Sequence, residues 1–202
     1  MQVDTRTWIL VGIATVIALT FHEVAHGYVA YRCGDNTAFL RGRLTLNPLK
    51  HIDPIGTIIL PLVLILAHSP FLFGYAKPVP VDFNALRHPR RDMMLVAAAG
   101  PFTNFALCLL FLLAFVVFGP EENSWLSDGL QICILTNLVL GLFNLIPIPP
   151  LDGSKVLAGI LPAHIARPYL RLGQFGLISI VIAVLLARPL LNRMLDAILN
   201  LF

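Results

Sequence analysis

Charged residues are scarce in this chain of 202 residues: lysine, arginine, aspartate and glutamate make up 12% of it, whereas 57% is apolar. Because an average soluble domain carries about 25% charged residues, this composition excludes an ordinary soluble enzyme. The net charge is only +3, and the basic residues form no continuous stripe, so nucleic acid is not expected as a partner. The sequence indicates an integral membrane protein that lies in a lipid bilayer.

Cysteine is also scarce. Cys33, Cys108 and Cys133 are an odd number without C-x-x-C spacing, and we expect free thiols that pack as small apolar groups. The amino-terminal residues lack the basic region of a cleavable signal. We therefore expect the first apolar run to be retained.

Four apolar runs are long enough to cross a hydrocarbon core of about 30 Å, which needs roughly 20 residues. These runs are residues 8–31, 93–118, 130–148 and 169–187. A fifth run, 55–73, is interrupted by two prolines and a histidine. We expect an all-α multi-pass protein whose residues 1–202 form a single membrane domain.

The distribution of basic residues predicts the orientation. Eleven of the fourteen lysines and arginines lie in segments 32–50, 77–91 and 155–171, whereas loop 119–129 has none and carries three acidic residues. By the positive-inside rule the basic segments are cytoplasmic and loop 119–129 is external. Since the chain must then cross an even number of times between the first two long runs, 55–73 is expected to be re-entrant or interfacial; the alternative is a full crossing with an unseen second pass.

The first apolar run contains His22-Glu23-Val24-Ala25-His26. On a helix, residues four apart share a face, so the two imidazoles can bind one metal ion while Glu23 lies beside them as acid/base. Three ionisable residues at bilayer depth cost roughly 2.5 to 3.5 kcal/mol each, which disfavours the alternative of an incidental polar face. At roughly 1.5 Å per residue, the histidines fall in the cytoplasmic half of the bilayer.

A catalytic zinc usually has three protein ligands, and no other histidine is a persuasive third one. The remaining histidines are His51, His68, His88 and His164, for which a solvated or capping role is expected. In contrast, Pro147, Pro149 and Pro150 must end the helix before Asp152, and irregular backbone is tolerated at membrane depth only where it lines a cavity or is buried in protein. We therefore expect this segment to line a cavity or to be buried in protein; the alternative is an ordinary surface turn.

These motifs resemble those of the site-2 proteases, the intramembrane zinc metalloproteases. The family's H-E-x-x-H, G-P-x-x-N and N-x-x-P-x-P-x-L-D-G motifs occur in order at residues 22–26, 100–104 and 144–153, and 74–81 is similar to the short prokaryotic branch. The resemblance covers about residues 8–160 and includes no PDZ or CBS domain. The roles that it implies are these: zinc ligands His22, His26 and Asp152; catalytic acid/base Glu23; substrate or oxyanion contact Asn144; helix packing or substrate contact Gly100, Pro101 and Asn104. If Asp152 is a ligand, the proline-rich segment must fold back toward the histidines.

The resemblance implies one Zn²⁺ ion per chain, which suits hydrolysis because zinc is a Lewis acid without redox chemistry. The implied activity is endopeptidase cleavage in or near the transmembrane segment of a single-span protein, in regulated proteolysis or clearance of signal remnants. The alternative is a zinc-binding or transport protein that uses the same ligands. The substrate, the cleaved bond, the regulator and the oligomeric state stay open.

The expected fold has three transmembrane helices around the zinc site, together with additional membrane segments. Two smaller elements complete it. Residues 40–46 alternate between apolar and polar residues, which predicts a small membrane-associated β element. Its free edge could pair with an extended substrate; the alternative is a surface hairpin. After the run 169–187, the tail 189–202 is expected to form an amphipathic helix on the external surface.

Overall fold

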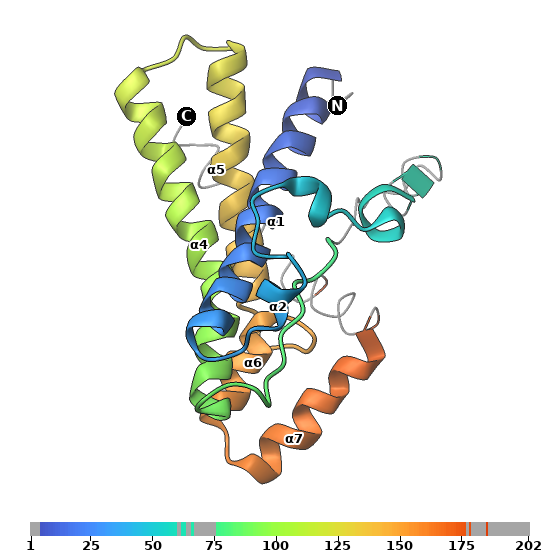
Figure 1. Cartoon of the computed structure of the whole chain (residues 1–202). Coiled ribbons are helices and arrows are strands. Elements are labelled where there is room, and N and C mark those ends of the chain that lie inside the picture. The colour runs from blue at the N-terminus through green and yellow to red at the C-terminus, as the bar shows by residue number, and fades with distance from the viewer. Residues whose placement is uncertain are drawn as a thin grey trace.

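Three long helices form the body of the protein. The computed structural model describes residues 5–59, 62, 63, 66, 76–176, 178 and 185. Helices α1 (Thr5–Arg32), α4 (Pro89–Phe118) and α5 (Trp125–Asn144) are each long and apolar enough to cross a membrane. They lie side by side and pack against one another (Figure 1). The chain is therefore a helical membrane protein, as its composition indicates.

The ends of these helices follow from local sequence. Helix α4 begins with Pro89, whose missing amide proton costs nothing in a first turn. It ends before Gly119, which adopts φ 48° in the left-handed region. Helix α5 starts earlier than residue 130 because the Ser124 side chain accepts a hydrogen bond of 3.0 Å from the Ser127 amide. It ends at Asn144, because the prolines that follow cannot continue it.

One end of the bundle joins the start of α1 to the loop between α4 and α5. The guanidinium of Arg6 forms an ion pair of 2.8 Å with Asp128 and donates to the carbonyl of Asn123. The start of α1 and the acidic loop therefore lie at the same end, as Figure 1 shows. Arg32 at the end of α1 and Arg90 and Arg91 at the start of α4 therefore lie at the opposite end, as the charge distribution predicts.

At that opposite end, α1 finishes beside the start of α4. The Arg87 amide donates to the Cys33 carbonyl at 3.0 Å, and the Lys77 amide donates to the His51 carbonyl at 2.8 Å. The chain between α1 and α4 thus returns to the end from which it left. It makes no net crossing, as the parity argument requires. Most of segment 55–73 lies outside the described residues.

Short elements lie beside the bundle, some at its lower end and others at about mid-height in Figure 1. They are α2 (Thr37–Leu40), η1 (Pro48–Lys50), η2 (Pro54–Ile59), α6 (Asp152–Ile160), α7 (Ala163–Arg171) and η3 (Leu172–Phe175). Helix α6 packs on α4, and α7 follows it. Tyr169, the first residue of the expected run 169–187, lies within α7, whose Arg167 and Arg171 are exposed. Most of that run and the tail 189–202 lie outside the described residues.

The predicted β element at 40–46 is wrong, and the described residues contain no strand. Leu40 ends α2, and Gly42 turns the chain at φ 61°. The next segment is held by a side chain instead of a backbone ladder: the buried Arg43 guanidinium donates to the carbonyl of Lys77 at 2.9 Å. The alternation of apolar and polar residues at 40–46 therefore belongs to an irregular extended stretch. This stretch offers no strand edge with which a substrate could pair.

Candidate metal centre

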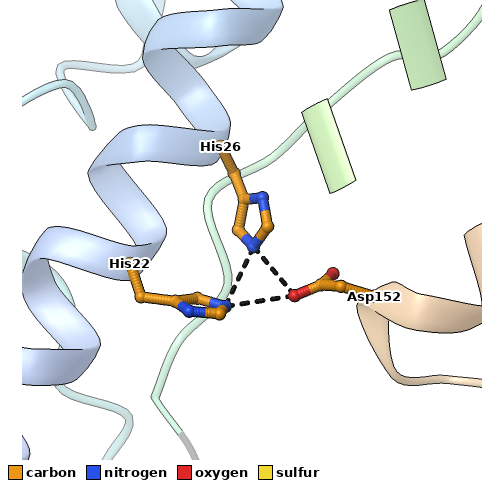
Figure 2. Close-up of side chains that lie close together, drawn as sticks. All are labelled: His22, His26 and Asp152. Carbon is orange, nitrogen blue, oxygen red and sulfur yellow. Dashed lines mark hydrogen bonds and ion pairs between the residues drawn. The ribbon is translucent and has the colours of Figure 1, made fainter. Parts of the chain in front are cut away.

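Three side chains from two distant segments meet inside the bundle. His22 and His26 lie one turn apart on α1, and Asp152 is the first residue of α6 (Figure 2). The Nε2 atoms of the histidines are 3.0 Å apart, and each lies 3.1 Å from Oδ2 of Asp152. The residues are 4%, 9% and 5% exposed. They could hold a metal ion, and the described residues contain no other such group.

Asp152 reaches the histidines because the chain folds back after α5. A Cβ atom on Gly153 would lie 2.1 Å from the carbonyl oxygen of Leu145, so only glycine allows this close approach. The hydroxyl of Ser154 donates to the carbonyl of Leu151 at 2.6 Å and holds the first turn of α6. The fold-back required for Asp152 to act as a ligand is what the structure shows.

The histidine rings are oriented by acceptors on α4. Nδ1 of His22 donates to Oδ1 of Asn104 at 2.6 Å, and Nδ1 of His26 donates to the carbonyl of Val96 at 2.6 Å. Neither acceptor can donate a proton, so each imidazole carries a proton on Nδ1, and in the neutral ring the lone pair lies on Nε2. The two lone pairs and the Asp152 carboxylate therefore face one another.

A cation fits this arrangement of donor atoms. With neutral imidazoles these three atoms can only accept, and they would repel at about 3 Å unless a positive charge lay among them. Ligand atoms on a tetrahedral zinc with bonds of about 2.0 Å are about 3.3 Å apart, close to the 3.0 and 3.1 Å seen here. Two imidazoles and one carboxylate are also a known ligand set for catalytic zinc.

The second oxygen of Asp152 has a partner of its own. Nζ of Lys155, one turn along α6, lies 3.0 Å from Oδ1. This contact leaves Oδ2 directed at the histidines and partly balances the carboxylate charge. Lys155 is a functional candidate that no sequence motif identified.

Glu23 lies in the cavity beside the three side chains. Its Oε2 accepts a hydrogen bond of 2.7 Å from the amide of Val79. Because Pro78 and Pro80 lack amide protons, Val79 offers the one N–H donor among these three residues. The cavity has a volume of about 340 Å³. It is lined by His22, Glu23, His26, Pro78, Val79, Val81, Phe83, Val96, Ala97, Asn144, Pro150, Leu151, Asp152 and Lys155.

The other motif residues occupy different positions. Asn144 lines the cavity while its amide donates to the carbonyl of Leu140 at 3.0 Å, so it both ends α5 and faces the site. Gly100 lies against the two imidazoles, and Pro101 is buried in α4. Asn104 is fully buried and does not line the cavity. Its position agrees with helix packing and gives no direct contact with a substrate in the cavity.

The remaining described histidines lie elsewhere. His51 is 3% exposed, caps η1, and donates from Nε2 to the carbonyl of Thr45 at 2.8 Å. His88 and His164 are exposed. His68 lies outside the described residues.

Comparisons with known proteins agree on one family. The pattern that defines Peptidase family M50 matches residues 119–188. A candidate zinc metalloprotease of Bacillus subtilis, YwhC, is 39% identical over 94% of this chain and 89% of its own length. A candidate zinc metalloprotease of Mycobacterium tuberculosis, Rip2, is 32% identical over 92% of this chain and 69% of its own. The zinc metalloprotease MJ0392 of Methanocaldococcus jannaschii is 24% identical over 76% of this chain and 35% of its own. No solved structure matches.

Proposed function

Since the chain belongs to peptidase family M50 and is a zinc metalloprotease, we propose that it cleaves a single-span membrane protein within or near its transmembrane segment. The observation that carries this proposal is the cluster of His22, His26 and Asp152 inside a bundle of three apolar helices. A protease for soluble substrates would not need its ligands on a membrane-spanning helix. The cofactor of the family is Zn²⁺, and we assign its binding to these three residues, one ion per chain.

The metal ion and the groups that line the cavity have separate roles in the proposed hydrolysis. When bound, the zinc ion acts as a Lewis acid that polarises a carbonyl and lowers the pKa of a water molecule. Glu23 faces the same cavity and would accept the proton from water and return it to the leaving amine. The Val79 amide keeps the Glu23 carboxylate in place at 2.7 Å. Asn144, at the cavity wall, could donate its amide to the developing oxyanion.

The cavity walls suit a substrate segment that comes from the membrane. Apolar side chains form the rest of the cavity wall, among them Val81, Phe83 and Leu151. A helix has its carbonyls hydrogen-bonded internally, so the substrate must unwind before a peptide bond can enter. We assign the site to the cytoplasmic half of a prokaryotic plasma membrane and the activity to regulated proteolysis or clearance of signal remnants. Residues 1–202 would act as a single domain.

The alternative, zinc transport with the same ligands, has less support. A transport path needs ionisable residues at successive depths, whereas His22, Glu23, His26 and Asp152 line one cavity. Transport also gives no role to a carboxylate that faces the ligands without belonging to the cluster.

Cleavage of a matched set of reporters tests the substrate class. One reporter would carry a single transmembrane segment, and the other would carry the same flanking sequence without it, both incubated with purified protein in vesicles. We expect cleavage of the membrane reporter alone, with loss of activity after chelation and recovery with zinc. Equal cleavage of both reporters would contradict the proposed substrate class, and zinc uptake into the vesicles without cleavage would favour transport.

A further inference from the structure

A buried chain of hydrogen bonds runs from α5 through α4 to His22. Asn137 on α5 donates from Nδ2 to the carbonyl of Cys133 at 2.9 Å. Its Oδ1 accepts from Nδ2 of Asn104 at 3.0 Å, and Oδ1 of Asn104 accepts from Nδ1 of His22 at 2.6 Å. Asn104 and Asn137 both have an exposed fraction of 0%.

The direction of this chain is determined at its ends. A backbone carbonyl can only accept, so the amide nitrogen of Asn137 must face Cys133, and its oxygen must face Asn104. Asn104 likewise donates to the carbonyl of Ala18 at 3.2 Å. Both amide protons of Asn104 are then used, and only its oxygen can face His22. Neither asparagine can flip, because a flip would place the amide oxygen against a backbone carbonyl oxygen, that of Ala18 for Asn104 and that of Cys133 for Asn137.

The consequence is a fixed tautomer of His22. Because the oxygen of Asn104 faces Nδ1, this nitrogen carries the ring proton, and the lone pair lies on Nε2. Nε2 is the atom that lies 3.1 Å from Oδ2 of Asp152. Groups that orient a ligating histidine raise metal affinity, since the ring has no competing tautomer.

We propose that Asn137 is a positioning residue for the zinc site, which acts through Asn104 to hold His22 in the tautomer that binds metal. This inference rests on the proposed role of His22 as a ligand. It assigns a purpose to a polar side chain that lies outside every motif of the sequence and is fully buried in a membrane-spanning helix. A packing role alone would be served as well by an apolar residue of similar size.

Zinc affinity of the purified protein, measured by competition with a chelator, tests this role. We expect Asn137→Ala to weaken zinc binding about 10-fold or more, the range for groups that orient a ligand. Cys133→Ala is the matched control, because only the backbone carbonyl of Cys133 joins the chain; we expect it to bind zinc as the unaltered protein does. Unchanged affinity in a folded Asn137→Ala protein would overturn the proposal.

A double-mutant cycle shows whether Asn137 acts through Asn104. If it does, Asn137→Ala should cause little further loss in a protein that already carries Asn104→Ala. An equal loss in both backgrounds would overturn the relay. If Asn137→Ala does not fold, Asn137→Asp replaces it: a protonated carboxyl keeps an acceptor toward Asn104 and a donor toward Cys133, so near-normal affinity is expected and a large loss would contradict the proposal.

His22→Ala separates this inference from the proposed function. If His22→Ala keeps full zinc affinity, the ligand assignment itself fails. If His22→Ala loses zinc while Asn137→Ala keeps it, the ligand assignment stands and only the relay is wrong.

Discussion

The backbone of Gly100 on α4 lies directly against the imidazole of His22 on α1. A Cβ atom at Gly100 would lie 2.6 Å from Nε2 of His22 and 2.5 Å from Nε2 of His26. Carbon and nitrogen atoms at van der Waals contact are at least about 3.4 Å apart. The glycine therefore leaves the space in which the ligand atoms converge, and it explains why α4 can approach α1 so closely here.

Gly100→Ala should abolish or strongly reduce zinc binding, because the added methyl group displaces both rings. Zinc content of the purified protein would be measured after desalting. Gly12→Ala is the matched control, since a Cβ atom at this α1 glycine meets nothing within 4 Å. Normal zinc content in Gly100→Ala would show that the rings can move aside and that zinc binding does not require glycine at this position.

The ligand set predicts the effect of three single substitutions. We expect about one zinc per chain in the unaltered protein and loss of most of it in His22→Ala, His26→Ala and Asp152→Ala, since a catalytic site usually has three protein ligands. His51→Ala should keep its zinc, because His51 donates to Thr45 and lies outside the metal-binding cluster. Full retention by Asp152→Ala would remove the aspartate from the site.

Asp35 predicts a dependence of stability on pH. Its two oxygens accept from the amides of Thr37 and Asp82 at 2.8 Å each. Burial alone would raise the pKa of Asp35, but hydrogen bonds from the Thr37 side chain and from these two amides outweigh it and hold the pKa below its usual range. Since the folded pKa is the lower one, this stabilisation is present above the ordinary value of about 4 and is lost as pH falls through the folded pKa.

Asp35→Asn should therefore lower the melting temperature at neutral pH and have a smaller effect in acid. An amide has one acceptor oxygen, so one of the two buried donors loses its partner, at a cost of about 1 to 3 kcal/mol. Thermal unfolding at several pH values measures this loss of stability. The exposed Asp82→Asn is the control, because asparagine can still accept from the Asn84 amide. Equal effects of Asp35→Asn at every pH would exclude a contribution from its charge.

The orientation predicts labelling from opposite sides of the membrane. Single cysteines at Asn84 and Glu122, both exposed, would be placed in a cysteine-free protein. We expect an impermeant thiol reagent to reach position 122 from outside and position 84 only from the cytoplasm. Labelling of both positions from outside would contradict a membrane crossing by α4, which lies between them.

The local parts of this architecture could be predicted from the sequence. Runs of apolar residues predict α1, α4 and α5, and helical spacing places His22 and His26 on one face. The prolines before Asp152 require an interruption of the helical backbone. In each case a property of neighbouring residues determines the structure.

Contacts between distant segments could not be predicted in the same way. The amide of Val79 that holds Glu23 is a backbone group, and every residue except proline has one. Asn137 appears as an isolated polar residue until the packing of α4 on α5 places it beside Asn104. The false strand at 40–46 has a related cause, since alternation does not show whether a partner strand exists. Here the segment is held by one of its own side chains, since Arg43 donates to the carbonyl of Lys77.

Glu23→Gln, assayed for both zinc and cleavage, tests the central claim most directly. Glutamine keeps the shape of glutamate but cannot accept the proton of an attacking water, and Glu23 lies outside the cluster of metal-binding atoms. We predict that the variant binds zinc as the unaltered protein does and does not cleave the transmembrane reporter. Cleavage at the unaltered rate by zinc-loaded Glu23→Gln would contradict the proposed mechanism.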